Sequence, residues 1–277
     1  MDIKLIALDL DRTTLNAKGK ISKINRQAIM DAMEAGVHVC IASGRAFDTL
    51  PEDVVSIPGI EYAITSNGAA IYQIKGKRLL KSYLLTPQSV DIILEVSKGY
   101  PVTYEAFIDG IAYASEEYIK DPMKFGATPQ GVIYVQSTRK PVADIVSFIR
   151  DNKEHLDSID IVVNGNELKK ELRTKIAEAT SEVYQTSSVK QLLEIAHCNA
   201  GKKSGVEFLV HHLGLERNQT AAFGDADNDI DMIEYAGCGI AMENATANLM
   251  KVADYVTLHH DKDGVAHGLR NILKIIE

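Results

Sequence analysis

The stretch LDLDRTTLN (residues 8–16) places two carboxylates directly after a short apolar run, Ile3 to Leu8. Such a run is typical of a buried strand, and side chains two apart in an extended chain point to the same side. Asp9 and Asp11 are therefore predicted to converge just beyond the carboxyl end of that strand, where open α/β sheets bind ligands. Two carboxylates this close repel each other unless a cation lies between them, and Mg²⁺ is a hard cation that takes oxygen ligands. The alternative is that both aspartates cap a turn or the following helix.

A second acidic cluster, GDADND at residues 224–229, also follows an apolar run, Thr220 to Phe223. If both clusters lie at strand ends, their carboxylates can pool around one cation, while Gly224 lets the backbone turn tightly. The alternative is a surface loop in which Asn228 and Asp229 cap the next helix. Two clusters in equivalent positions favour the shared cation site.

Two shorter signals also end predicted strands, ASGR at residues 42–45 and TSNG at residues 65–68. The Ser43 hydroxyl and the Gly44 amide can both donate hydrogen bonds to a phosphoryl oxygen. Either tetrapeptide is also ordinary turn chemistry. The two segments are therefore candidate phosphate contacts with a simpler alternative.

A pair of lysines, Lys202 and Lys203, follows Gly201 at the start of a predicted helix. A lysine beside a metal-bound phosphate offsets the negative charge that develops during phosphoryl transfer. A Lys-Lys pair at a helix start otherwise faces solvent. The lysines alone leave both interpretations open.

Strands and helices alternate in both end regions of the chain. Helices are predicted at Lys23 to Ala35, where Ile24, Ala28, Ala32 and Ala35 mark one face, and at Lys203 to His212. This alternation predicts an α/β fold with a parallel sheet and right-handed crossovers. The predicted strands are Ile3 to Leu8, Val37 to Ala42, Tyr62 to Thr65, Thr220 to Phe223, Gly239 to Met242 and Tyr255 to Leu258.

The middle of the chain has a different pattern. A hairpin is predicted around Asp109-Gly110, because two strands with two-residue alternation flank it, Val102 to Phe107 and Ile111 to Ala114. We therefore predict an inserted α+β domain at residues 86–188, between two parts of one core at residues 1–85 and 189–277. Its other predicted elements are strands at Val132 to Gln136 and Ile159 to Val163 and a helix at Val142 to Asn152.

Composition excludes several classes of protein. The 277 residues carry 30 basic and 38 acidic side chains, a net charge of −8 without a concentrated basic run, which disfavours a nucleic-acid partner. Cys40, Cys198 and Cys238 are widely spaced, so we expect core thiols rather than disulfides or a metal site. The N-terminal apolar run is too short for a signal peptide, and no stretch approaches membrane-spanning length. We expect no membrane partner and a cytoplasmic location.

Taken in order, these pieces resemble the haloacid dehalogenase superfamily, and within it the Cof-type phosphatases that carry a large cap of the second class. The match spans nearly the whole chain, and supporting features of the subfamily appear in SNGA (66–69), MENA (242–245) and DGVA (263–266). The resemblance implies a Rossmann-like parallel-sheet core with an inserted α+β cap domain. The four superfamily motifs are met by Asp9, Asp11 and Thr13; by Ser43; by Lys202; and by Gly224, Asp225, Asn228 and Asp229.

The resemblance also implies roles for the motif residues. Asp9 attacks phosphorus and forms an aspartyl-phosphate, while Asp11 protonates the leaving alcohol and later takes a proton from the hydrolytic water. The implied Mg²⁺ ligands are Asp9, the backbone carbonyl of Asp11, Asp225 and, as a support or through water, Asp229. The implied phosphate contacts are the N–H of Leu10, Ser43 with Gly44, Lys202 and Asn228.

The sequence departs from the family pattern at two positions. The family most often has Gly after the second aspartate and an apolar residue after the threonine, whereas this chain has Arg12 and Thr14. We hypothesise that Arg12 contacts the substrate or the closed cap; the alternative is an exposed arginine tolerated in a turn. In the segment KKSGVEFL, the family spacing from the lysine to the apolar helix positions selects Lys202 over Lys203.

The leading prediction is a Mg²⁺-dependent phosphatase of small phosphorylated metabolites, sugar phosphates being the commonest substrates by family resemblance, with the cap as selector. A phosphomutase is an alternative; it returns phosphate to the substrate and depends on a bisphosphorylated activator. A second alternative is a metabolite-binding regulator that has lost its chemistry. The intact Asp9, Asp11, Lys202 and Asp225 count against that regulator.

Overall fold

The structure, a computed structural model, describes residues 2–277 and divides into two compact units. The first unit comprises the chain up to Arg45 together with Leu50–Lys81 and Gly201–Glu277. The second comprises Ala46–Thr49 and Ser82–Ala200. Both ends of the chain thus build one unit, and the other is inserted between them. The domain boundaries at residues 86 and 188 stay predictions.

The first unit contains one sheet with the strand order β14-β13-β12-β1-β2-β3-β4-β5 among the described residues. Strands from β14 to β3 are parallel, as predicted, whereas β4 runs antiparallel to β3. Because β1 lies between β2 and β12, the segments after these strands leave the sheet at the same edge. The strands are β1 (Leu5–Leu8), β2 (His38–Ala42), β3 (Tyr62–Thr65), β4 (Ala70–Gln73), β5 (Arg78–Ser82), β12 (Thr220–Gly224), β13 (Cys238–Ala241) and β14 (Tyr255–Val256).

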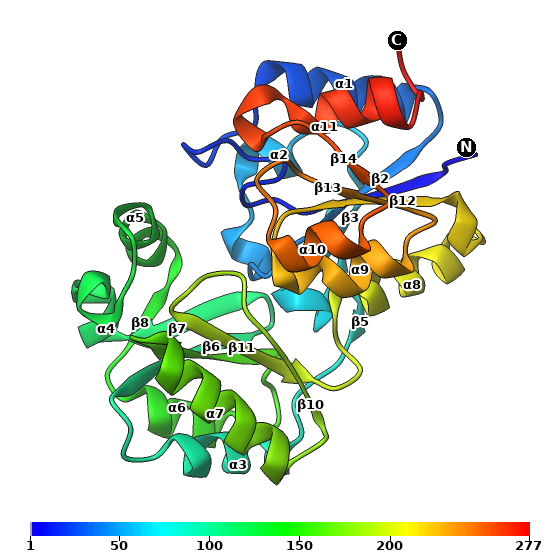
Figure 1. Ribbon diagram of the computed structural model, residues 1–277. Helices are drawn as coiled ribbons and strands as arrows, with labels where there is room; N and C mark the ends of the chain where they lie inside the picture. Colours follow the sequence, from blue (N-terminus) through cyan, green and yellow to red (C-terminus); the bar gives the residue numbers. More distant parts are fainter. Residues whose placement is uncertain (1) are drawn as a thin grey trace. The chain divides into compact units, whose positions relative to one another are not determined.

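Helices cover both faces of this sheet. Figure 1 shows α1 and α11 on one face and α8, α9 and α10 on the other. In α1 the hydroxyl of Ser22 accepts the N–H of Asn25, and Ala28 and Ala32 are buried as predicted. Ile24 and Ala35 are predicted on the same face, but Ile24 is 52% exposed and Ala35 is exposed too, because the buried face is centred on Asn25, Ala28, Ile29 and Ala32. The helices are α1 (Lys23–Glu34), α2 (Glu52–Val55), α8 (Lys202–His212), α9 (Ile230–Tyr235), α10 (Ala247–Val252) and α11 (Gly264–His267), with short helical turns η2 (Ser66–Gly68), η4 (Arg217–Gln219), η5 (Asp227–Asp229), η6 (His260–Lys262) and η7 (Gly268–Ile272).

The second unit is an α+β domain with the strand order β10-β11-β9-β6-β7-β8 in the part of the chain described. Helices α3, α6 and α7 pack on one face of this sheet (Figure 1), around a core that includes Tyr104, Ile159 and Ile195. The predicted hairpin is present, and Asp109 and Gly110 have φ values of 52° and 77°, as a tight left-handed turn requires. The elements are β6 (Val102–Ile108), β7 (Ile111–Ser115), β8 (Lys140–Val142), β9 (Ser158–Val163), β10 (Val183–Thr186), β11 (Leu192–His197), α3 (Pro87–Ser97), α4 (Glu116–Lys120), α5 (Pro129–Thr138), α6 (Ile145–Asp151), α7 (Asn166–Ala179), η1 (Phe47–Thr49) and η3 (Pro122–Phe125).

Two further local predictions are wrong. The segment 132–136, predicted as a strand, lies inside helix α5, because Thr128 accepts the N–H of Gly131 and Pro129 occupies the first turn. Cys198, predicted as a core thiol, is exposed in the turn after β11, whereas Cys40 and Cys238 are buried. Among residues 2–277, no helix has the length and apolar character needed to cross a membrane.

Candidate active site

The turn after β1 carries the first motif and is held by its own backbone. Asp9 is buried at the end of the strand, and its N–H donates to the carbonyl of Phe223 on β12 at 3.1 Å. The carbonyl of Leu10 accepts the N–H groups of Thr13, Thr14 and Leu15 at 3.3, 3.1 and 2.8 Å. The Thr14 hydroxyl donates to the Asp9 carbonyl at 2.6 Å, which gives this departure from the family pattern a structural role.

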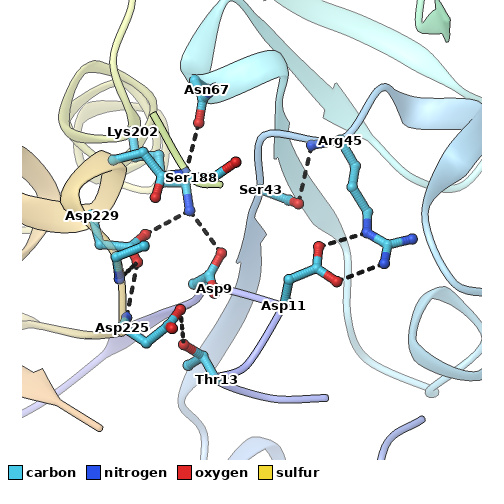
Figure 2. Close-up of polar contacts among 12 residues, drawn as sticks. Asp9, Asp11, Thr13, Ser43, Arg45, Asn67, Ser188, Lys202, Asp225 and Asp229 are labelled. Carbon is cyan, nitrogen blue, oxygen red and sulfur yellow. Dashed lines mark hydrogen bonds and ion pairs between the residues drawn. The ribbon is translucent and has the colours of Figure 1, made fainter. Parts of the chain in front are cut away.

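Three buried carboxylates meet at the carboxyl edge of the sheet. Oxygens of Asp9, Asp225 and Asp229 all lie within 4.8 Å of one another, although Asp9 follows β1 and the other two follow β12. The ammonium of Lys202, at the start of α8 and fully buried, lies 2.7 Å from Asp9 Oδ1 and 2.5 Å from Asp229 Oδ1 (Figure 2). Lys203 is exposed, so only the first lysine of the pair reaches the cluster.

The loop after β12 is shaped by Asp229. Its Oδ2 accepts the N–H groups of Asp225 and Ala226 at 2.9 and 3.1 Å. A Cβ on Gly224 would lie 2.5 Å from Asp229 Cβ, so only glycine fits at the end of this strand. Thr13 Oγ1 donates to Asp225 Oδ1 at 3.4 Å and thereby connects the two motif loops.

The charges of this cluster are only partly balanced. Burial raises the pKa of Asp9 to about 7, despite the opposing effect of Lys202. Burial, with the charges of Asp9 and Asp229, raises the pKa of Asp225 to about 8. Burial opposes the charge on Lys202, but the carboxylates of Asp229 and Asp9 outweigh it and hold the pKa of Lys202 above its ordinary value.

A hard divalent cation fits this donor set. The cluster offers three carboxylates from two loops, and carboxylate oxygens are the ligands that Mg²⁺ prefers. Burial is the main cause that favours protonation of Asp9 and Asp225, and repulsion between the carboxylates adds to it; a bound cation would offset both. The donor chemistry and the uncompensated charge therefore both agree with the cation site that the sequence predicts.

Asp11 lies outside the carboxylate cluster. Its side chain is 54% exposed and pairs with Arg45, with Asp11 Oδ2 2.8 Å from Nε and Oδ1 2.6 Å from Nη2 (Figure 2). The predicted convergence of the Asp9 and Asp11 carboxylates is therefore not found. β1 ends at Leu8 and the chain is already turning at Leu10, so strand alternation no longer directs the Asp11 side chain. From the sequence, Arg45 is only the last residue of the ASGR segment, and its pairing with Asp11 is not predicted.

The candidate phosphate contacts surround the same edge. Ser43 is buried at the end of β2, and its Oγ accepts the N–H of Arg45 at 3.2 Å, which leaves the hydroxyl proton free to point elsewhere. Gly44 follows it, and Asn228 is buried with its amide donating to Asn67 Oδ1 at 3.0 Å. Asn67 has a left-handed φ of 52°, and its carbonyl accepts the N–H of Gly201 at 2.9 Å. The TSNG segment thus positions the start of α8.

Asn244, in the MENA segment, has a role that no spacing reveals. Its amide nitrogen donates to the carbonyl of Arg12 at 2.9 Å and lies 3.4 Å from Asp225 Oδ2. Its Oδ1 accepts the N–H of His260 at 3.1 Å. One side chain therefore connects the first motif loop, the fourth motif and the segment before DGVA.

Comparison with known proteins gives a consistent family. Residues 6–269 match the haloacid dehalogenase-like hydrolases. Phosphatase YwpJ of Bacillus subtilis is 31% identical over 98% of this chain and 100% of its own, and 5-amino-6-(5-phospho-D-ribitylamino)uracil phosphatase YwtE of the same organism is 31% identical over 98% of each. A solved haloacid dehalogenase-like hydrolase from B. subtilis matches with a TM-score of 0.84 at 28% identity, covering 98% of this chain and all of the other. The chain therefore belongs to the haloacid dehalogenase-like hydrolase family and is a phosphatase of the Cof type.

Proposed function

We propose that this phosphatase is Mg²⁺-dependent and hydrolyses small phosphorylated metabolites, sugar phosphates first among them, through an aspartyl-phosphate on Asp9. The observation that carries the proposal is the buried contact of Asp9 Oδ1 with Lys202 beside the Asp225 and Asp229 carboxylates. Such a site holds a carboxylate nucleophile next to positive charge, which an attack on a phosphate dianion requires.

Asp9 performs the covalent step. One of its oxygens attacks phosphorus, the bond from phosphorus to the leaving oxygen breaks, and Asp11 supplies the proton that the leaving alkoxide needs. In the second step, water attacks the phosphoryl group on Asp9, Asp11 takes the proton of that water, and inorganic phosphate and free Asp9 are released. Arg45 holds the Asp11 carboxylate at the edge of the site between these events.

Mg²⁺ would be held by Asp9, Asp225, the backbone carbonyl of Asp11 and, directly or through water, Asp229. When bound, it offsets the charge of the phosphoryl group so that an anionic nucleophile can approach. Lys202, whose ammonium contacts Asp9, neutralises part of the same charge.

The remaining motif residues bind the phosphoryl oxygens. We assign this role to the Leu10 N–H, to the Ser43 hydroxyl with the Gly44 N–H, and to the Lys202 ammonium. Asn228 completes the set with its amide. Each supplies a donor to an anion whose charge grows or moves in the transition state.

The substrate class rests on the relatives and on the inserted domain. The relatives include enzymes named as phosphatases of 5-amino-6-(5-phospho-D-ribitylamino)uracil, a small phosphorylated metabolite. A solved structure with the same fold at 18% identity is titled a subclass IIB sugar phosphatase. We propose that the α+β cap selects among such metabolites, because a closing cap excludes water and completes the pocket.

Release of inorganic phosphate from a panel of phosphorylated metabolites, with and without Mg²⁺, tests the proposal. We expect release that stops when the cation is chelated and returns when Mg²⁺ is added. A phosphomutase would instead convert one sugar phosphate into its isomer and require a bisphosphorylated activator. Release at the same rate in chelator would contradict the Mg²⁺ dependence, and no release from any substrate would contradict the hydrolysis.

A further inference from the structure

Arg12 stands beside both motif aspartates and has no part in the reaction proposed above. Its backbone is left-handed, with φ of 63°, a conformation that glycine adopts freely and arginine rarely. The carbonyl of Leu10 fixes the turn from one side by accepting the Thr13 N–H. Asn244 fixes it from the other side by donating to the Arg12 carbonyl at 2.9 Å. The arginine side chain therefore starts from a defined point at the rim of the site.

From that point the guanidinium reaches inward. Arg12 Nε lies 3.7 Å from Asp225 Oδ2, and the Asp225 side chain is only 4% exposed whereas that of Arg12 is 64% exposed. The other Asp225 oxygen receives the Thr13 hydroxyl. Arg12 thus pairs with the one cluster carboxylate that Lys202 does not touch within hydrogen-bond distance.

The charge balance of the cluster shows that the contact between Arg12 and Asp225 competes with a divalent cation. Asp9, Asp225 and Asp229, when ionised, carry three negative charges, and Lys202 balances one of them. A divalent cation balances the other two, whereas Arg12 balances one. Arg12 and the cation therefore satisfy the same excess charge, and both cannot do so at full strength.

We propose that Arg12 is a built-in counter-ion of the cation site: it pairs with Asp225, competes with the divalent cation for that carboxylate and so weakens the binding of the cation. This inference rests on the cation site of the proposed function. It assigns to Arg12 a role within the first unit that needs neither substrate nor cap. Because the guanidinium is mostly exposed, it can leave Asp225 for solvent when the cation arrives.

Binding of Mn²⁺ alone, followed by electron paramagnetic resonance of the free ion and by competition with Mg²⁺, measures this directly. Arg12→Asn and Arg12→Gly remove the charge, and both replacements tolerate a left-handed backbone. We expect cation binding about three- to tenfold tighter in both variants, with a difference that shrinks as salt is raised. Arg12→Lys, which keeps the charge, should stay close to the wild type. Arg78→Asn, which removes an exposed arginine on β5, controls for the change in net charge.

The outcomes separate the inference from the function on which it rests. Tighter binding in the neutral variants, with Arg78→Asn unchanged, supports the role of Arg12. Unchanged or weaker binding in Arg12→Asn and Arg12→Gly, while Asp225→Asn loses the cation, overturns the counter-ion and leaves the cation site in place. If the wild type and Asp225→Asn bind Mn²⁺ equally or not at all, both the inference and the proposed cation site are wrong. Circular dichroism of each variant establishes that the fold is retained.

Discussion

Both units contain buried acidic groups, and they are balanced in different ways. In the first unit, Asp9, Asp225 and Asp229 come from two loops and converge within 4.8 Å around the ammonium of Lys202. In the second, Glu105, Asp160 and Glu194 lie side by side on β6, β9 and β11, where the strand register pairs each with the next.

The row in the second unit has partners within its own domain, although Glu105 Oε1 and Arg139 Nε are buried without a hydrogen bond to any described residue. Arg139 lies 2.5 Å from Glu105, and Glu194 accepts the hydroxyl of Ser188 at 2.9 Å. Burial and the charges of Glu194 and Glu105 raise the pKa of Asp160 well above its ordinary value, so this carboxyl favours its neutral form. Strand ends can aim carboxylates at one point, whereas adjacent strands keep them about 5 Å apart. The first arrangement suits a cation, whereas in the second one carboxylate, that of Glu105, is paired with an arginine.

The largest difference is expected for the same substitution in both places. Asp9→Asn should lower turnover by at least about 10⁴-fold, because the amide is a poor nucleophile. Asp160→Asn should leave turnover of a small activated phosphate within about threefold. Steady-state phosphate release from both purified variants makes the comparison. Comparable losses would erase the functional distinction between the two acidic groups.

Asp11 tests whether exposure excludes a catalytic role. Asp11→Asn should slow hydrolysis of ordinary phosphate esters by about 10² to 10⁴, the usual loss for a general acid or base. An activated ester with a good leaving group should still form phosphoenzyme in a rapid-quench measurement, because that leaving group needs no proton. Equal losses on both substrates would make Asp11 a structural partner of Arg45.

Comparing the two lysines at the start of α8 tests whether the buried ammonium of Lys202 is needed for turnover. Lys202→Ala should lower turnover by about 10² to 10³, since it removes a positive charge beside the transferring group. Lys203→Ala, one residue along and exposed, should change turnover less than about threefold. Measurement of kcat for both variants makes the comparison. A larger loss in Lys203→Ala than in Lys202→Ala would overturn the assignment of Lys202 to the site.

Arg139 tests the balance in the second unit. Arg139→Met leaves the fully buried Glu105 without its partner and should destabilise folding by about 3 to 5 kcal/mol, measured by urea unfolding. The double variant Glu105→Gln/Arg139→Met removes both charges and should recover a large part of that loss. No recovery in the double variant would show that packing of Arg139, rather than its charge, stabilises the domain.

The smallest effect concerns pH. A carboxyl whose pKa is raised on folding binds its proton more tightly in the native state, so its contribution to stability is present below its ordinary pKa and is lost as pH rises through the raised value. Unfolding of the wild type should therefore become easier from about pH 4 upward because of Asp160. Asp160→Asn should flatten this part of the profile in urea titrations. If the free energy of unfolding changed with pH by the same slope in the variant and the wild type, Asp160 would not be the cause of the pH dependence.

Much of the site follows from the sequence because parallel strands end at one edge. Asp9, Ser43 and Asp225 each follow a strand of the same sheet, so strand assignment alone brings them together. The choice of Lys202 over Lys203 came from the family spacing between the lysine and the apolar positions of α8, because the lysine pair alone left both interpretations open. The positions of these residues needed no knowledge of loops.

The rest depended on turns and on contacts distant in sequence. Asp11 lies three residues past the end of β1, so its pairing with Arg45 has no periodic signal. Asn244 connects to Arg12 across 232 positions, and only the folded chain brings them together. The misassigned segment 132–136 is apolar enough for either a strand or a helix, and the Thr128-Pro129 start signal would have decided between them.

The position of β1 between β2 and β12 also governs when the enzyme can become active during its synthesis. β2 is complete at residue 42, but β12 begins at residue 220. Translation adds about 5 to 20 residues per second, so β12 is synthesised on the order of 10 to 40 s after β2. During that interval one edge of β1 is unpaired. That edge is open to misplaced strands and to chaperones during the interval. The inserted domain, encoded between them, has all its strands before the first unit can close.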